Sequence, residues 1–178
     1  MSHPPIVALG FAEASALVNN PGGAAISALL CIHGPREFAV ESPAVPLRKV
    51  LRFDDTEAPD PEDPLSAAMF RFRQRRAAAD GLTLVPPTPG HADEIIAFAE
   101  AVRGARGLVV CHCFAGVSRS TAAALICLAV WTGPGREQEC MAHLLRIRPC
   151  AAPHDGLVLF ADRRLGRGGR LAAASAGL

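Results

Sequence analysis

Residues 109–131, VVCHCFAGVSRSTAAALICLAVW, constrain the fold of this chain more than any other stretch. The segment Leu108–His112 has the composition of a buried strand, and Arg119–Trp131 has that of a buried helix. Between them lies a short loop of small residues that carries a thiol and a guanidinium. Buried polar groups cost free energy unless they have partners. The joint between strand and helix is therefore the place where we expect function.

Strands and helices alternate along the rest of the chain. Strands are predicted at 6–9, 25–32 and 45–53, and helices at 11–18, 64–79, 91–103, 137–147 and 156–165. This alternation predicts an α/β fold with a central, mostly parallel sheet flanked by helices. In such sheets ligands bind where strands end and helices begin, as the loop after His112 does.

The length and composition fit one domain. The chain has 178 residues, of which 50% are hydrophobic, enough for a substantial core. We expect a single domain over residues 1–165. Within it, residues 57–90 form an insertion with an extra helix that follows an acidic, proline-rich loop. The glycine- and alanine-rich tail, residues 166–178, is predicted to be flexible.

Charge and hydropathy exclude several partners and indicate a location. A formal net charge of +1 gives no general case for nucleic acid or an anionic membrane as partner. The longest uncharged apolar stretch, Ser120–Gly133, is too short for a membrane span. The first residues lack the layout of a signal peptide, so a cytoplasmic location with unpaired cysteines is expected.

The loop between the strand and the helix has the chemistry of an anion site. If the loop curls, its backbone N–H groups form a nest, to which the following helix adds its positive end. Arg119 can hold two phosphate oxygens at once. The same electrostatic field favours the thiolate form of Cys113, which is the nucleophilic form. One loop can thus bind a phosphate and attack it.

The segment His112-Cys113-Phe114-Ala115-Gly116-Val117-Ser118-Arg119-Ser120 resembles the His-Cys-x5-Arg-Ser/Thr signature of the cysteine-dependent protein tyrosine phosphatases. Its second half is most similar to the dual-specificity branch. The segment 148–157, RPCAAPHDGL, is similar to a second motif of that branch, Arg-Pro-x3-Pro-Asn-x-Gly-Phe. His154 replaces the usual asparagine and Leu157 the frequent phenylalanine. The resemblance covers roughly residues 45–165.

This resemblance implies a mechanism and a set of roles. Cys113 would attack phosphorus and form a phosphocysteine, with no metal and no cofactor. Arg119 and the amides of the loop would stabilise the transferring phosphoryl group. His112 would orient the loop, and Ser120 would donate a hydrogen bond to the sulfur. The substrate-binding residues would be those of the loop: Phe114, Ala115, Gly116, Val117, Ser118, Arg119 and Ser120.

The reaction also needs a proton donor for the leaving group, because expelling an unprotonated phenolate of pKa ~10 is slow. A predicted strand runs into Asp54 and Asp55 as the family's general-acid segment does, which favours Asp55, with Asp54 second. Both lie farther before Cys113 than is usual in the branch. Asp80 has a more typical spacing but follows a helix. The sequence leaves the three open.

The substrate and two rival functions remain to be weighed. The loop has no lysine, which favours phosphotyrosine in a protein, or another aryl phosphate, over a multiply charged inositol phosphate. The basic run Arg71–Arg76 is either a solvated helix face or a site for acidic residues near a phosphosite. A non-catalytic phosphate-binding pseudophosphatase would keep the loop without a working acid. A rhodanese-like or arsenate-reductase-like thiol enzyme would also place a cysteine in an anion loop.

The other cysteines and histidines suggest two lesser possibilities. Cys111 and Cys113 are two residues apart on a strand, so they can share a face. A redox switch between them is conceivable, but a buried core cysteine is the simpler interpretation of Cys111. A zinc site is not favoured, because Cys-x-Cys is not the usual ligand spacing and Arg119 would repel the cation.

Overall fold

The computed structural model describes residues 3–42, 44–59 and 62–177 and has the predicted α/β architecture. The four strands are β1 (Ile6–Leu9), β2 (Ile26–His33), β3 (Leu47–Arg52) and β4 (Leu108–His112). They form one sheet in the order β1-β4-β2-β3, and every pair is parallel. All four strands therefore end at the same edge of the sheet.

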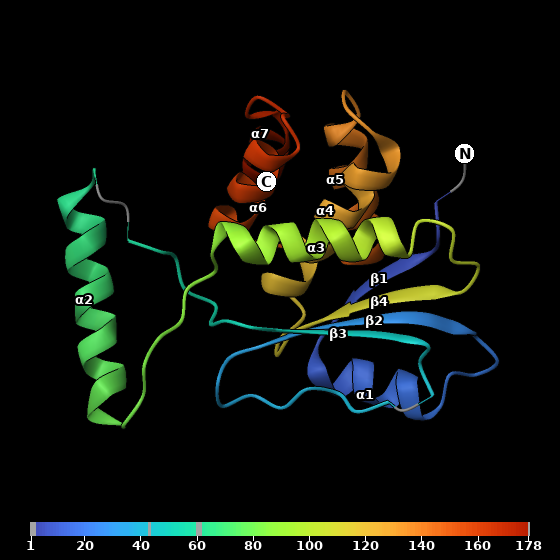
Figure 1. Ribbon diagram of the computed structural model, residues 1–178, viewed down its shortest axis with the longest axis horizontal. Coiled ribbons are helices and arrows are strands. Elements are labelled where there is room, and N and C mark those ends of the chain that lie inside the picture. Colours follow the sequence, from blue (N-terminus) through green and yellow to red (C-terminus); the bar gives the residue numbers. More distant parts are fainter. Residues whose placement is uncertain (1–2, 43, 60–61, 178) are drawn as a thin grey trace.

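Helices cover both faces of this sheet (Figure 1). One face is covered by α1 (Phe11–Asn19). On the other side lie α3 (Pro89–Ala101), α4 (Arg119–Thr132), α5 (Glu137–Ile147), α6 (Asp155–Arg164) and α7 (Arg170–Ala176). Of these, α4 packs directly on β1, β2 and β4, and α5, α6 and α7 form an outer group around it. No helix in the described part of the chain has the length and apolarity needed to cross a membrane.

The side chains of the central strand β2 point alternately to the two faces of the sheet and so contribute to two hydrophobic cores. On β2, Leu29 and Cys31 pack in the smaller cluster on the α1 side. Their neighbours Leu30 and Ile32 belong to the larger cluster. Successive side chains of a strand point to opposite faces, so one buried strand supplies both cores.

The central helix α4 is buried from Arg119 to Trp131. Its first turns contain Ser120, Thr121 and three alanines, and these small side chains fit between the sheet and the surrounding helices. Because α4 follows β4 after a six-residue loop, its N-terminus lies at the edge where the strands end. The anion-binding end of a helix thus lies where the sequence predicted a ligand site.

The prediction of a flexible tail at 166–178 is wrong for its described part. Residues 170–176 form α7, in which Leu171 and Ala174 are buried. The buried carboxylate of Asp162 accepts hydrogen bonds from the amides of Gly169 (2.7 Å) and Leu171 (2.8 Å). This carboxylate caps the otherwise unpaired amides at the start of the short helix. The glycine content of the tail could not reveal this contact.

The helix of the predicted insertion, α2 (Pro64–Ala79), projects from the rest of the molecule (Figure 1). It begins at Asp63, whose side chain accepts a hydrogen bond from Leu65 N at 2.9 Å, with Pro64 in the first turn. None of its residues is buried. This helix adds nothing to either core, unlike α1 and α3–α7.

Candidate functional site

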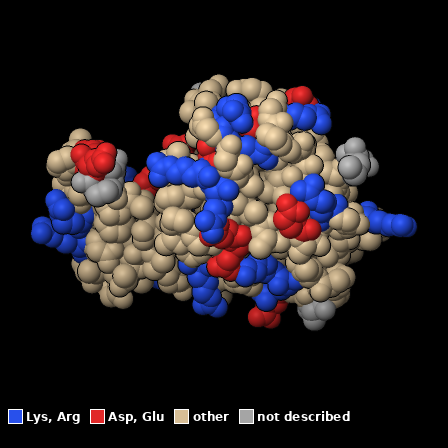
Figure 2. Space-filling view, turned by 45° about the horizontal axis from the view of Figure 1, so that its top comes forward, with Lys and Arg blue, Asp and Glu red and all other residues tan. Residues whose placement is uncertain are grey.

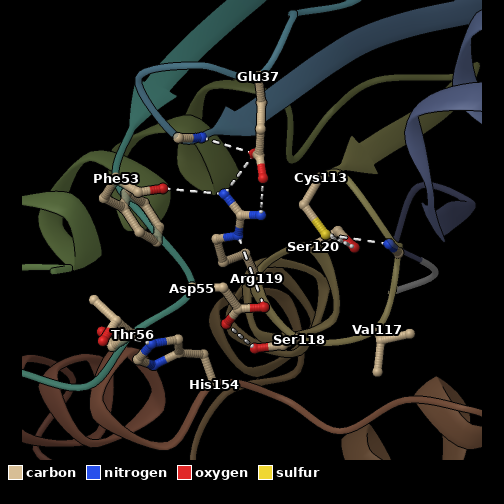
Figure 3. A network of polar contacts seen from close by, with 12 residues as sticks. Glu37, Phe53, Asp55, Thr56, Cys113, Val117, Ser118, Arg119, Ser120 and His154 are labelled. Carbon is tan, nitrogen blue, oxygen red and sulfur yellow. Dashed lines mark hydrogen bonds and ion pairs between the residues drawn. The ribbon is translucent and has the colours of Figure 1, made fainter. Parts of the chain in front are cut away.

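Cys113 lies at the bottom of the loop between β4 and α4, with an exposed fraction of 2%. Its Sγ accepts a hydrogen bond from Gly116 N at 3.2 Å and lies 3.2 Å from Ser120 Oγ (Figure 3). The sulfur thus accepts a hydrogen bond from a loop amide, and the Cys113 thiol donates one to Ser120 Oγ in the first turn of α4. Both the amide and the serine hydroxyl can donate to the sulfur once the thiol proton is lost.

The carbonyls of the loop point outward, away from this sulfur. Each accepts a hydrogen bond from a neighbouring segment: Phe114 O from Phe11 N, Ala115 O and Gly116 O from Arg148, and Val117 O from Ala152 N. In a trans peptide the next N–H points opposite to the C=O. The amides of residues 115–118 therefore point inward, and one of them, Gly116 N, reaches Cys113 Sγ. The loop is an anion-binding nest, which we call the cradle.

Two features hold the cradle in this shape. Arg148 donates from Nε to Gly116 O at 2.9 Å and from Nη1 to Glu13 Oε1 at 2.8 Å, which ties the cradle to α1. Gly116 has a φ of 74°. A Cβ added there would lie 2.3 Å from Gly10 N, so only glycine fits both the backbone conformation and the space.

Arg119 is the buried cation of the site, with an exposed fraction of 3%. Its Nη1 and Nη2 donate to Glu37 Oε2 and Oε1 at 2.8 Å and 2.9 Å, and Nη1 also donates to Phe53 O at 3.1 Å (Figure 3). Burial alone would raise the pKa of Glu37, but hydrogen bonds from Arg119 and from Gly34 N lower it below its usual range. Glu37 is therefore a fixed anion that orients the guanidinium.

The remaining donors of Arg119 form a fork. A guanidinium has five N–H groups, and the three bonds to Glu37 and Phe53 use both on Nη1 and one on Nη2. The N–H of Nε and the second N–H of Nη2 remain, side by side. Nε is buried and has no hydrogen-bond partner among the described residues. A planar oxyanion edge matches this fork, as in bidentate arginine–phosphate pairs.

Asp55 is the carboxylate that the structure brings to the cradle. Its Oδ1 accepts a hydrogen bond from Ser118 Oγ at 2.7 Å, and its Oδ2 lies 4.0 Å from Arg119 Nε (Figure 3). The side chain has an exposed fraction of 45%. It thus stands at the open side of the cradle, within reach of both a ligand and solvent.

The other two candidate acids are engaged elsewhere. Asp54 accepts a hydrogen bond from Val85 N at 2.7 Å, and its own amide donates to Val85 O at 2.6 Å, so it joins the end of β3 to the segment before α3. Asp80 lies at the C-cap of α2, on the projecting helix. A side chain that pairs strand-like segments, or that caps a remote helix, is not placed to meet a ligand in the cradle.

His154 connects the segment that carries Asp55 to the start of α6. It is buried, its Nε2 lies 3.2 Å from Thr56 O, and its Nδ1 accepts from Leu157 N at 3.4 Å as an N-cap (Figure 3). Nδ1 also lies 3.1 Å from Glu57 Oε1, and burial raises the pKa of Glu57. The histidine, at a position where the sequence led us to expect asparagine, fixes the residues on the C-terminal side of Asp55.

His112 and Cys111 lie beneath the cradle. Burial lowers the pKa of His112 to about 4, and its Nε2 accepts a hydrogen bond from Val40 N at 3.5 Å. The ring is therefore neutral at neutral pH. Cys111 is fully buried, and a hydrogen bond with Cys127 together with burial raises its pKa well above the usual range. These surroundings fit a core cysteine rather than a reactive one.

The sequence did not identify Glu37 and Glu13, the two acidic partners of the site arginines. Glu37 follows β2 and Glu13 lies in α1, the helix that follows β1. Their position after strands that end at the site edge was the available signal. Within the described ranges, no group of three or more histidine, cysteine or acidic side chains is arranged to hold a metal ion.

Solved structures share the fold of this chain. No family model and no curated protein matches the sequence. The human dual-specificity phosphatase DUSP28 matches with a TM-score of 0.58 at 19% identity, over 98% of this chain and 96% of that chain. The Yvh1 phosphatase domain from Chaetomium thermophilum matches with a TM-score of 0.54 at 20% identity, over 93% and 92%.

A third match limits what the fold implies. The human tyrosine phosphatase-like serine/threonine/tyrosine-interacting protein has a TM-score of 0.51 at 17% identity, over 92% of this chain and 89% of that chain. Its name calls it phosphatase-like and describes it as an interacting protein, whereas DUSP28 and Yvh1 are named as phosphatases. The fold therefore has to be combined with the residues of the site before an activity follows.

Proposed function

We propose that this chain, which has the fold of the dual-specificity phosphatases, is a cysteine-dependent phosphatase that hydrolyses phosphomonoesters through a phosphocysteine intermediate. The observation that carries the proposal is the convergence on one cradle of three groups. These are the sulfur of Cys113, the free fork of Arg119 and the carboxyl group of Asp55. A thiol, a buried cation and an exposed acid are the minimal set for phosphoryl transfer to sulfur.

In the first step the thiolate of Cys113 attacks phosphorus and the bond to the leaving oxygen breaks. The amides of residues 115–118 and the fork of Arg119 would stabilise the three non-bridging oxygens. Such preorganised donors act without reorganising during the reaction. The proton carried by Asp55 would pass to the leaving oxygen, so that a neutral alcohol or phenol departs.

In the second step water attacks phosphorus and displaces the sulfur. Asp55, now a carboxylate, would take a proton from this water, and phosphate leaves the cradle. Ser120 Oγ, 3.2 Å from the sulfur, would stabilise the departing thiolate. Neither step needs a metal ion or a cofactor.

For the substrate we propose phosphotyrosine or dual-specificity sites in proteins, or another aryl phosphate. The cradle contains one cation, Arg119, and its variable residues Phe114, Ala115, Val117 and Ser118 are uncharged. A single phosphate dianion matches that charge better than a multiply phosphorylated ring. Phe114, exposed by 66%, offers an aromatic surface at the entrance for a phenyl ring.

The test is hydrolysis of p-nitrophenyl phosphate in EDTA by wild type and by Cys113→Ser. We expect turnover by wild type that Cys113→Ser abolishes, while tungstate still binds to the variant. Turnover that survives in Cys113→Ser would contradict the phosphocysteine mechanism. A folded wild-type protein that binds tungstate without turnover would instead be a phosphate-binding module.

A further inference from the structure

The exposed side of α2 carries an apolar stripe. Leu65, Met69 and Phe72 have exposed fractions of 68%, 51% and 62%, and all three lie on the helix that has no buried residue. They are spaced by four and three residues and therefore share one face. Exposed apolar side chains that are clustered in this way mark an interaction surface.

Basic side chains accompany the stripe. α2 holds Arg71, Arg73, Arg75 and Arg76 and no acidic residue from Pro64 to Ala79. Arg76 continues the stripe after Phe72, at the next helical step. Figure 2 shows basic side chains at the outer edge of the lobe that α2 forms at the left of the molecule. The charge of this surface is complementary to an acidic partner.

The helix that carries this surface also contacts the segment next to the candidate active site. Arg73 Nη1 donates to Thr56 Oγ1 at 3.5 Å, next to Asp55 in the chain, and Gln74 Oε1 accepts from Leu84 N at 3.0 Å. A cavity of about 480 Å³ lies between Arg73 and the cradle. Its walls include Arg73, Ser118 and three carboxylates, those of Asp55, Glu57 and Asp155. A ligand in the cradle can therefore extend through this cavity toward α2.

The cavity also offers an unsatisfied polar group. Ser175 lines it with an exposed fraction of 4%, and its Oγ has no hydrogen-bond partner among the described residues. A buried hydroxyl without a partner costs free energy that a polar ligand would recover. The cavity wall is thus suited to the peptide groups and polar side chains that flank a phosphorylated residue.

We infer that α2 is a docking element for a phosphoprotein substrate whose neutral residues run from the cradle through this cavity and whose acidic residues, farther from the phosphorylated residue, meet the arginines of α2. The inference rests on the proposed function. The helix is about 24 Å long at 1.5 Å per residue. About seven residues of extended peptide span that length at roughly 3.3 Å each. The segment recognised lies on one side of the phosphorylated residue.

The test compares phosphotyrosine peptides of about fifteen residues that are neutral next to the phosphotyrosine and carry either glutamate or glutamine at the distal positions that reach α2. In wild type at low salt we expect the acidic peptide to have the higher kcat/KM, with an advantage that falls as salt is added. Arg75→Gln/Arg76→Gln should lower kcat/KM for the acidic peptide about three- to tenfold, through KM, as expected for exposed ion pairs. The kcat/KM for p-nitrophenyl phosphate, which does not reach α2, is the internal reference.

The matched control is Arg106→Gln/Arg163→Gln, which removes two exposed arginines outside α2. It should leave the preference for the acidic peptide unchanged. Equal kcat/KM for the two peptides, or the same loss in both double variants, would overturn the inference. So would binding of wild type to phosphatidylglycerol vesicles, lost in Arg75→Gln/Arg76→Gln, without any peptide preference, because α2 would then be a membrane-surface helix.

The outcome is separable from that of the proposed function. If wild type does not hydrolyse p-nitrophenyl phosphate, the phosphatase proposal fails while docking can still be measured. Calorimetric binding of the two peptides to Cys113→Ser then decides: tighter binding of the acidic peptide supports docking on α2, and equal binding contradicts it.

Discussion

Arg119 and Glu37 face each other through two hydrogen bonds, of 2.8 Å and 2.9 Å, that leave a fork of the guanidinium free. Because Glu37 holds the fork in place, Glu37→Gln should weaken the binding of tungstate or phosphate about tenfold. It should also lower the free energy of unfolding by about 2 kcal/mol. This is less than for a fully buried pair, because Glu37 is 26% exposed. Competitive inhibition and urea denaturation measure the two effects.

The control for this prediction is Glu41→Gln in the same segment, where the glutamate is exposed. It should leave both quantities within error of wild type. Equal effects from both substitutions would mean that general negative charge, not the pairing with Arg119, supports the site.

Asp55 and Asp54 should respond differently to replacement by asparagine. Asp55→Asn removes the proposed proton donor, and we expect turnover of a phenyl phosphate to fall about 10²–10⁴-fold, with loss of the basic limb of the pH profile. Asp54→Asn weakens the contact with Val85 N and should lower stability by about 1–2 kcal/mol, with a smaller effect on turnover. The pH dependence of kcat separates the two, since only the loss of the acid removes its basic limb.

Gly116→Ala and Gly135→Ala form a matched pair. Both glycines have positive φ, 74° and 85°. A Cβ at 116 would lie 2.3 Å from Gly10 N, whereas at 135 nothing described lies within 4 Å. Gly135→Ala should therefore cost about 1–2 kcal/mol from the backbone alone. Gly116→Ala should cost clearly more and abolish tungstate binding, as thermal denaturation and calorimetry would show; equal costs would contradict the close approach.

His112 makes stability depend on pH. Its pKa is about 4 in the folded protein, lowered by burial from 6.5. Between these two pKa values the unfolded chain binds more protons at His112 than the folded protein does. The contribution of His112 to the free energy of unfolding is therefore present above pH 6.5 and is lost as the pH falls toward 4. The loss attributable to this group is about 2 kcal/mol by pH 5. Urea denaturation at pH 7 and 5, for wild type and His112→Asn, would test it: the variant should lose less, and equal losses would exclude His112 as the cause.

Local patterns predicted most of the fold because they arise from burial along single segments. β4, α4 and α5 lie where apolar runs and helical spacing placed them, and the sheet is parallel as strand–helix alternation predicted. The prediction for residues 166–178 failed because the order of this segment depends on Asp162, a residue in another helix. Glycine-rich sequence indicates local freedom but carries no information on such a tertiary partner.

The residues of the candidate site likewise fall into those that local sequence predicts and those that depend on tertiary contacts. The cradle is contiguous in sequence, so the nearness of Cys113 to Arg119 follows from one loop. Glu37, by contrast, reaches Arg119 across 82 residues. Which aspartate faces the cradle depends on where the chain goes after β3, and there Asp54 accepts a hydrogen bond from Val85 N. Contacts between distant loops follow from strand order, which single-sequence patterns do not reveal.

The distribution of the six cysteines has a practical consequence for spectroscopy. Five are buried and Cys150 is exposed, two residues after Arg148, whose guanidinium holds the carbonyls of the cradle. In the Cys113→Ser variant, which lacks the proposed nucleophile, a thiol-reactive fluorophore should therefore attach at Cys150. Its emission would follow movements of the cradle as ligands enter and leave, so this single variant would serve as a reporter of ligand binding.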